Sequence, residues 1–361
     1  MKTGILSILF LTLCALAPRV SAQPGPGLGL QVSSSGPTLS LTGTVGTVYS
    51  IQYTAGLSPT NLWVDRTLLQ AGNVWTDPDV PTRTQRFYRA VSVAAPADTN
   101  LVFIQPGTFT MGSPLNEFDR ASDETQHTVT ISRGFWMEKF LVSQGDYLLV
   151  VRTNPSYFRN GTNGTAFGGT AGAITDELVH PVEQVTWFEA TNYCALRTQQ
   201  ERAGGLIPTN YAYRLPTESE WEYASRAGTT TALYLGSGLQ SGEANFNGHY
   251  EYGAALTFYG YDPSGILLGI TTPVGSYPAN PWGLYDMMGN VWEWCQDWYS
   301  AYPGQSVIDP QGPASAHDRV VRGGGLAGVG GDCRSAARLR YYPWYRHTFI
   351  GFRVVLASSQ P

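Results

Sequence analysis

Short runs of alternating apolar and polar residues occupy the chain between residues 31 and 95. Three such runs cover 48–54, 61–69 and 85–93. In the first run, Tyr49, Ile51 and Tyr53 share one face, as side chains two positions apart do on a strand. Clusters of Gly, Pro, Asn and Asp separate the runs, as expected for turns. This pattern predicts a small all-β sandwich over residues 31–95, which contains no cluster of residues suited to catalysis.

The segments around this predicted sandwich lack that periodicity. Residues 23–30, QPGPGLGL, are rich in Gly and Pro and predict a flexible lead-in. Residues 96–100 continue the alanine- and proline-containing stretch that begins at Ala94, and they predict a linker. A second, larger domain is then expected over residues 101–356, with a tail at 357–361.

The window 281–298, PWGLYDMMGNVWEWCQDW, predicts a turn followed by a strand. Gly289 supplies backbone freedom, and the side chains alternate after it. Trp292 and Trp294 then share one face, while Glu293 lies on the other face beside a valine and a cysteine. A carboxylate on an apolar face must be ion-paired, hydrogen-bonded or bound to a cation, because an isolated buried charge is costly.

Two helices and one hairpin are also predicted in the second domain. Residues 186–203 place Trp187, Ala190 and Cys194 near one helical face. Residues 216–226 begin with proline and carry three glutamates, which suit the positive end of a helix dipole. A further segment, LVFIQPGTFTM, predicts a hairpin that turns at its Pro-Gly pair.

The N-terminus and the overall composition limit where the protein acts and what it binds. Residues 1–22 combine Lys2, an apolar run and a small-residue site at Ala22, which predicts a secretory signal cleaved after Ala22 and a secreted or periplasmic protein. No other run approaches the ~20 apolar residues of a membrane span, so no membrane insertion is expected. Charged residues are 14% of the chain and the net charge is −5. Nucleic acid is therefore not an expected partner.

The reactive side chains do not form a recognisable catalytic motif. The mature chain keeps three cysteines, an odd number, so at most one disulfide can form within it. The five histidines are scattered and lack a His-x3-His-x-Glu spacing, so no iron site is expected. No nucleophile-elbow spacing is present either.

Five motifs together resemble the formylglycine-generating enzyme and sulfatase-modifying factor family. They are RLPTESEWEYASRAGT at 214–229, TPVGSYPAN at 272–280, GLYDMMGNVWEW at 283–294, RVVRGG at 319–324 and GFRVV at 351–355. They follow the family's order over residues 101–356. The resemblance implies an α+β, loop-rich fold of the C-type-lectin-like kind that this family adopts.

The resemblance also implies what an active member needs. Members that make formylglycine carry two cysteines just after the Gly-Gly turn, where they bind copper(I) and engage the substrate thiol. This chain has LAGVGG at 326–331 instead, and Cys333 lies further on. Copper(I) requires soft thiolate ligands, so neither copper binding nor formylglycine formation is expected.

Calcium is the cofactor that the resemblance implies, in a structural role. The expected ligands are Asn290, Val291 and Glu293, with a second site at Asn245 and Phe246. Side-chain and main-chain oxygens are suitable calcium ligands. An alternative for the glutamate stays open, namely an ion pair with an arginine such as Arg322 or Arg338.

The resemblance also narrows the choice of disulfide. Disulfide-bearing relatives carry cysteines where this chain has Ser225 and Ser335, and they pair the counterpart of Cys194 with a cysteine at the position of Val354. Cys295–Cys333 is then the pair left to test.

We therefore interpret the chain as a non-catalytic binding module. The loops expected to surround a groove are 159–174, 249–266 and 326–332, together with Trp344, Tyr345, Arg346 and His347. A groove rich in Tyr, Trp and Gly favours a peptide, a glycan or a protein surface as partner. The alternative is a metal-dependent oxidoreductase of the same family, whose substrate is a protein cysteine or another compound.

Overall fold

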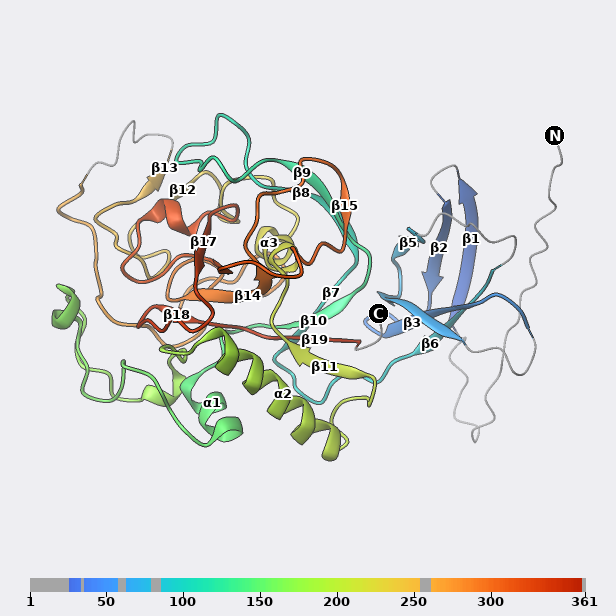
Figure 1. The fold of residues 1–361 in the computed structure, drawn as a ribbon, viewed down its shortest axis with the longest axis horizontal. Helices are drawn as coiled ribbons and strands as arrows, with labels where there is room; N and C mark the ends of the chain where they lie inside the picture. Colours follow the sequence, from blue (N-terminus) through green and yellow to red (C-terminus); the bar gives the residue numbers. More distant parts are fainter. Residues whose placement is uncertain (1–25, 34–35, 58–62, 79–85, 254–260, 359–361) are drawn as a thin grey trace.

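The computed structural model of the chain describes residues 26–33, 36–57, 63–78, 86–253 and 261–358 (Figure 1). The predicted signal segment, residues 1–22, lies outside these ranges. None of the helices in the described ranges combines the length and the apolar character needed to cross a membrane.

The N-terminal unit is built from two three-stranded antiparallel sheets. One contains β1 (Gly27–Ser33), β2 (Gly36–Thr42) and β5 (Val74–Thr76), and the other contains β4 (Val64–Gln70), β3 (Val48–Thr54) and β6 (Phe87–Ser92). Their inward side chains form one core, made of Leu39, Leu41, Tyr49, Ile51, Leu69 and Trp75. The predicted run 48–54 matches β3, and the runs 61–69 and 85–93 overlap β4 and β6, whereas β1, β2 and β5 were not predicted.

The predicted flexible lead-in is partly wrong, because β1 begins at Gly27. The sequence Gly-Leu-Gly-Leu at 27–30 alternates, and Leu28 and Leu30 pack against the core of this unit. Small and large residues in alternation satisfy the two-residue period of a strand as well as polar and apolar ones do.

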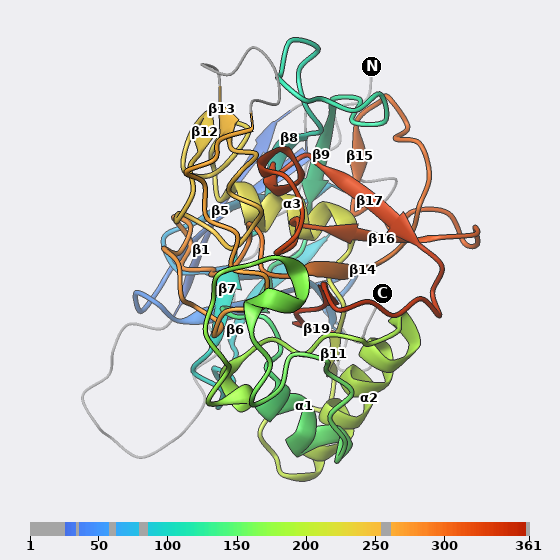
Figure 2. The same cartoon turned by 90° about the vertical axis from the view of Figure 1, so that its left-hand side faces the viewer.

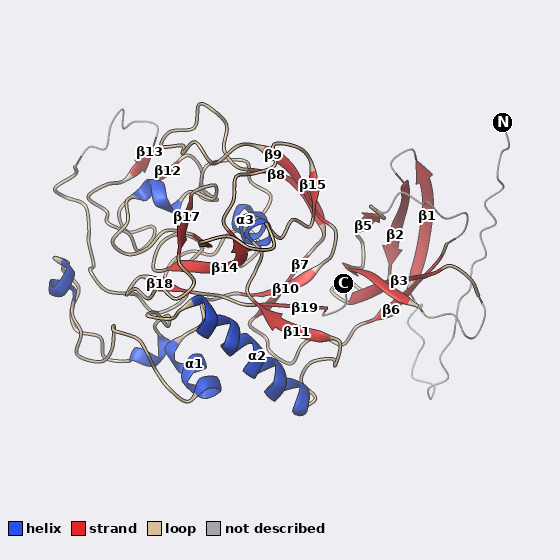
Figure 3. Cartoon of the chain, in the orientation of Figure 1, coloured by secondary structure: helices blue, strands red, loops and turns tan. Residues whose placement is uncertain are grey.

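The C-terminal unit combines three helices with several small sheets (Figure 3). The helices are α1 (Gln144–Val151), α2 (Trp187–Ala203) and α3 (Glu218–Arg226), with 3-10 turns η1 (Gly164–Phe167), η2 (Glu177–Val179) and η3 (Gly330–Cys333). One four-stranded sheet has the order β11 (Tyr211–Arg214), β19 (Val355–Ser358), β10 (Phe135–Glu138) and β7 (Leu101–Ile104). The other has the order β17 (Arg338–Tyr341), β16 (Arg319–Arg322), β14 (Trp292–Trp298) and β18 (Ile350–Gly351). Shorter pairings join β15 (Val307–Ile308), β9 (His127–Ile131) and β8 (Gly107–Met111), and join β12 (Gly238–Leu239) with β13 (Tyr252–Gly253).

Two sequence predictions about this unit are wrong. β7 and β8 do not form a hairpin, because β7 pairs with β10 and β8 pairs with β9. The chain passes from one sheet to another at the intervening Pro106. The predicted tail at 357–361 also begins too early, because β19 continues to Ser358 and pairs there with Tyr211 of β11.

β14 lies at the centre of the C-terminal unit. Trp294 is fully buried, and its indole N–H donates to the Val185 carbonyl at 2.9 Å. The indole of Trp187, the first residue of α2, donates to the Cys295 carbonyl at 2.9 Å. In Figure 2, β17, β16 and β14 lie side by side in this order, with α1 and α2 beyond β14. Both predicted helices are present as α2 and α3, each closed at its N-terminus by a capping box.

The two units pack against each other. The Trp75 indole donates to the Ser132 carbonyl at 2.9 Å, and the backbone N–H of Gly134 donates to Thr67 Oγ1 at 3.3 Å. Val48 and Leu68 of the sandwich belong to an apolar cluster formed mainly by the C-terminal unit. The sandwich is therefore joined to its neighbour by a shared core.

Candidate functional site

The loop after β16 is the segment in which the sequence predicts the loss of a copper site. Gly323 and Gly324 follow β16 with φ of +98° and +78°. A Cβ at Gly324 would lie 2.8 Å from Cys333 Sγ, so the backbone passes too close to this thiol for a side chain. Leu326 is 1% exposed and packs with Phe158, Ile174 and Ile270. The loop therefore directs its largest side chain into an apolar cluster.

The three cysteines of the described chain are free thiols, and all three are buried. Burial raises the pKa of the thiols of Cys194, Cys295 and Cys333 well above the ordinary value. The thiolate is the form that binds metal ions and acts as a nucleophile. The thiolate form of these cysteines is therefore disfavoured at neutral pH.

The predicted Cys295–Cys333 disulfide is not formed in the structure. Cys295 lies on β14, with its Sγ 3.9 Å from the Glu293 carbonyl oxygen, whereas Cys333 ends η3 and faces Gly324. Both residues belong to the same apolar cluster, but each thiol is enclosed by its own neighbours. Membership of one core does not by itself give the geometry of a disulfide.

We expect peptide mapping under non-reducing conditions to find Cys295 and Cys333 unbridged. Both thiols should resist iodoacetamide in the folded protein, because they are buried, and react after denaturation. A disulfide-linked peptide that contains both residues would contradict this arrangement.

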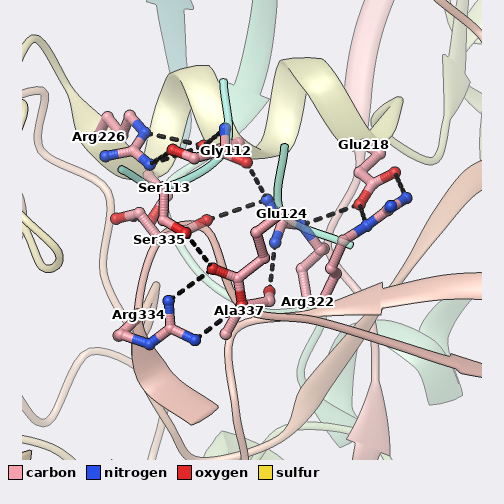
Figure 4. A network of polar contacts seen from close by, with 12 residues as sticks. Gly112, Ser113, Glu124, Glu218, Arg226, Arg322, Arg334, Ser335 and Ala337 are labelled. Carbon is pink, nitrogen blue, oxygen red and sulfur yellow. Dashed lines mark hydrogen bonds and ion pairs between the residues drawn. The ribbon is translucent and has the colours of Figure 1, made fainter. Parts of the chain in front are cut away.

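A network of buried ion pairs includes Arg322, which precedes the loop, and Arg334, which follows it (Figure 4). Arg338 donates from Nη2 to Glu218 Oε2 at 2.6 Å and from Nε to Oε1 at 2.8 Å. Arg322 forms an ion pair with Glu222, and both side chains are fully buried. Arg226, one helical turn after Glu222, also donates to that carboxylate, at 2.9 Å. The glutamates of α3, which the sequence explains by the helix dipole, are thus bound to arginines, and this role was missed.

A second part of the network fixes the segment that leads into β17. Arg334 donates to both oxygens of Glu124, at 2.7 and 2.8 Å, and to Glu117 at 2.9 Å. Arg322 also donates to the Ser335 carbonyl at 3.0 Å. Both carboxylates accept hydrogen bonds from the guanidinium group of Arg334. The arrangement therefore supports the loop and offers no unpaired carboxylate as a general base.

Glu293 is ion-paired, but with a different arginine from those proposed. Arg353 Nε donates to Glu293 Oε2 at 2.6 Å, and Nη2 donates to Oε1 at 3.0 Å. Both side chains are fully buried. Burial raises the pKa of this carboxyl above its ordinary value, while the positive charge of Arg353 opposes that shift. Arg322 and Arg338 are bound to the glutamates of α3 instead.

The loops that the sequence assigns to a groove do lie against one another. The backbone N–H of Gly330 in the third loop donates to the Tyr250 carbonyl of the second at 2.8 Å, and that of Thr170 in the first loop donates at 2.9 Å to the Leu267 carbonyl, one residue beyond the second loop. Residues 254–260 of the second predicted loop lie outside the described ranges. Leu326, from the third loop, packs with apolar residues of the first.

The predicted groove residues 344–347 form an exposed turn beside these loops. Trp344 is 64% exposed. Arg346 donates to Glu189 at 2.6 Å, and the ring of His347 lies 3.7 Å from that of Phe349, which packs on the same apolar cluster as Leu326. None of the four residues lines a cavity of about 350 Å³ between the two units or one of about 460 Å³ beside α2. Trp344 and Arg346 are exposed and Tyr345 and His347 are half-buried, so this turn is part of the protein surface.

Residues 89–358 match the sequence profile of the sulfatase-modifying factor enzyme 1-like domain. This chain belongs to that family. The matched range covers the C-terminal unit and begins within β6 of the sandwich.

Individual relatives of this sulfatase-modifying factor chain carry different names. The formylglycine-generating enzyme of Mus musculus is 28% identical over 71% of this chain and 74% of its own length. The serine/threonine-protein kinase pkn1 of Chlamydia caviae is 32% identical over 72% of this chain, but the match covers only 38% of that protein. The chain thus spans less than half the length of this chlamydial relative.

Solved structures of sulfatase-modifying factor type agree with the fold. The Treponema denticola variable protein 1 is 27% identical, with a TM-score of 0.54 over 71% of this chain and 94% of that one. PvdO from Pseudomonas aeruginosa is 25% identical, with a TM-score of 0.52 over 73% of this chain and 99% of that one. The predicted α+β, loop-rich fold is confirmed.

Calcium, which the sulfatase-modifying factor resemblance implies, fits some of the predicted ligands. Asn245 Nδ2 donates to Asn290 Oδ1 at 3.3 Å, so residues assigned to two sites meet in one place; the Thr272 N–H also donates to Asn290 Oδ1 at 3.1 Å, so a cation would have to displace these donors to bind that oxygen. Asn245 Oδ1 is buried and has no hydrogen-bond partner among the described residues, which leaves it available to a cation. Phe246 and Val291 are buried, at 2% and 0% exposure. Glu293 does not fit, because Arg353 occupies both of its oxygens.

No group of three or more His, Cys, Asp or Glu side chains suited to a metal occurs within the described ranges. A calcium site here would thus depend on amide and main-chain oxygens, as some calcium sites do in part. The serines at the positions of the family's other disulfide lie as the resemblance implies. Ser225 Oγ and Ser335 Oγ are 3.3 Å apart and hydrogen-bonded.

Proposed function

We propose that this sulfatase-modifying factor domain recognises a ligand and does not oxidise cysteine. The observation that carries the proposal is the state of the thiols. The loop after Gly324 contains no sulfur before Cys333, and all three cysteines are buried. Copper(I) chemistry on a substrate thiol requires accessible thiolate ligands. The fold is present without the ligands on which that reaction depends.

The proposed ligand is a peptide, a glycan or a protein surface. Exposed aromatic and polar side chains at 344–347, beside the loops that meet around Leu326, support this class of partner. The net charge of −5 gives no reason to expect nucleic acid. We also propose that residues 1–22 direct export and are removed after Ala22, so that the protein acts in a secreted or periplasmic location.

The competing function is a metal-dependent oxidoreductase, for which the similarity to the mouse formylglycine-generating enzyme is the main support. Metal analysis of the purified protein separates the two functions. We expect no stoichiometric copper or iron, because suitable thiol, histidine or carboxylate clusters do not occur in the described chain. One copper or iron ion per chain would favour the oxidoreductase.

We further propose a structural calcium ion at Asn245 and Asn290, with main-chain oxygens of Phe246 and Val291. A cation bound only by the folded state stabilises it by RT ln(1 + [L]/Kd), about 2.7 kcal/mol at a hundredfold excess over Kd. Treatment with a chelator should therefore lower the melting temperature, and added calcium should restore it. Asn245→Ala should remove this response to calcium. An unchanged melting temperature after chelation would contradict the proposed ion.

A further inference from the structure

A pair of parallel aromatic rings stands exposed where β17 ends. Tyr342 and Trp344 are 42% and 64% exposed, and their rings stack with an interplanar angle of 7° and a centroid distance of 5.3 Å. Contiguous exposed apolar surface on a soluble protein commonly marks a binding site. We call these two rings, with the polar side chains described next, the aromatic platform.

One polar side chain, His317, borders the stacked rings, and two more, Asp318 and Arg340, follow it. His317 lies against Tyr342, with ring centroids 4.2 Å apart in an edge arrangement. His317 Nδ1 is 3.1 Å from Asp318 Oδ1, and Arg340 Nε is 3.7 Å from Asp318 Oδ2. The side chains of His317 and Arg340 are 68% and 53% exposed. Donors and acceptors for hydrogen bonds therefore extend from the Tyr342 side of a flat aromatic surface.

The platform is held rigidly by α2 and the segment before it. The backbone N–H of Trp187 donates to the Pro343 carbonyl at 2.9 Å. Arg346 donates to Glu189 at 2.6 Å and to the Gln184 carbonyl at 3.0 Å. Tyr345 N–H donates to the Tyr342 carbonyl at 2.9 Å and closes the turn. A surface that is already ordered loses little conformational entropy when it binds a ligand.

We infer that the aromatic platform binds a neutral oligosaccharide. This inference rests on the proposed recognition function and names its ligand class. A pyranose ring presents a face of C–H groups, which packs on the electron-rich face of Tyr and Trp. Its hydroxyl groups around that face can donate to Asp318 and accept from Arg340 and His317. The charges of Asp318 and Arg340 balance, which favours a neutral ligand. The exposed surface is flat, aromatic and polar, whereas the grooves that bind helices are lined by aliphatic side chains.

The test uses the full chain and a panel of soluble neutral hexasaccharides: cellohexaose, chitohexaose, xylohexaose, laminarihexaose and mannohexaose. Binding is followed by isothermal titration calorimetry and by the change in tryptophan fluorescence. We expect saturable binding of at least one hexasaccharide. Trp344→Ala should weaken it by at least about tenfold, which corresponds to about 1.4 kcal/mol. Tyr342→Ala and Asp318→Asn should each weaken it several-fold.

Phe188→Ala is the matched control, because this aromatic side chain is also exposed (52%) but lies on α2 outside the platform. Its affinity should equal that of the unaltered protein. The inference is overturned if no hexasaccharide binds, if Trp344→Ala leaves affinity unchanged, or if a peptide array binds through Trp344 while every sugar fails. Those results would leave the recognition proposal in place, since bound copper or iron, or an aldehyde produced from a cysteine peptide, is what would contradict that proposal.

Discussion

Arg322→Ala should destabilise the protein by about 3–5 kcal/mol, the range found when one partner of a buried ion pair is removed. Arg322 is fully buried and forms its ion pair with Glu222, which is equally buried. The substitution would leave this carboxylate without Arg322 and would also remove the hydrogen bond to the Ser335 carbonyl. Urea denaturation, followed by intrinsic fluorescence, measures the loss of unfolding free energy.

Two variants make this expectation specific. Arg340→Ala removes an arginine that is 53% exposed and 3.7 Å from Asp318, so its effect should stay within about 1 kcal/mol. The double variant Arg322→Met, Glu222→Leu should be less destabilised than Arg322→Ala, because it removes both charges together. Equal effects of Arg322→Ala and Arg340→Ala would show that the buried network does not support the loop.

Glu183→Gln should slightly destabilise the protein at pH 5 and stabilise it at pH 8.5. Glu183 is fully buried; its Oε1 accepts from the Phe158 N–H at 2.9 Å, and Oε2 has no partner among the described residues. Burial raises the pKa of this carboxyl to about 8, against 4.5 in the unfolded chain. The folded state therefore holds a proton that the unfolded state loses.

The sign of the pH dependence follows from this difference in bound protons. The folded state binds more protons between pH 4.5 and about 8, so the stability contributed by Glu183 is present at pH 4.5 and is lost as the pH rises through about 8. At about 1.4 kcal/mol per pKa unit, the loss is at most about 5 kcal/mol. Burial likewise raises the pKa of Asp286 to about 6 and of Asp297 to about 8, so the unaltered protein should be more stable at pH 5 than at pH 8.5.

Comparison of two variants isolates Glu183 from the other carboxyl groups. Glu183→Gln cannot ionise, so it should be slightly less stable than the unaltered protein at pH 5 and more stable at pH 8.5. Glu189→Gln is the control, because hydrogen bonds from Thr186 and Arg346 outweigh burial and lower the pKa of Glu189, so its removal should cost a similar amount of stability at pH 5 and at pH 8.5. Urea titrations at pH 5 and pH 8.5 measure the unfolding free energy of each variant and test this expectation. Parallel pH profiles of Glu183→Gln and the unaltered protein would contradict a neutral buried Glu183.

The local elements of this fold could be read from the sequence because they depend on neighbouring residues. The alternation around Ile51 sets β3, and Thr186 and Glu189 form the capping box that begins α2. Helix α1 was missed, although Ser143 and Asp146 form the same kind of capping box before it. The signal was present in the sequence, but the helix is short and its apolar residues do not follow a clear period.

The partners of buried charges could not be read from the sequence. Burial of Glu293 follows from alternation, but its partner Arg353 lies 60 positions away and is brought close by the parallel pairing of β14 with β18. The sequence suggested Arg322 as the partner of Glu293. Arg322 does lie opposite Glu293, on β16, but its side chain forms an ion pair with Glu222. The predicted pairing of Cys295 with Cys333 likewise depends on a contact between distant segments, which only the three-dimensional packing determines, and both are free thiols in the structure.

The central claim is that the fold of a sulfatase-modifying factor is present here without cysteine oxidation. The direct measurement is mass spectrometry of a sulfatase-type cysteine peptide incubated with the protein, copper(I) and oxygen. The buried thiols and the sulfur-free loop predict that the peptide keeps its cysteine. An aldehyde product that appears with the unaltered protein and disappears with Cys333→Ser would contradict this account.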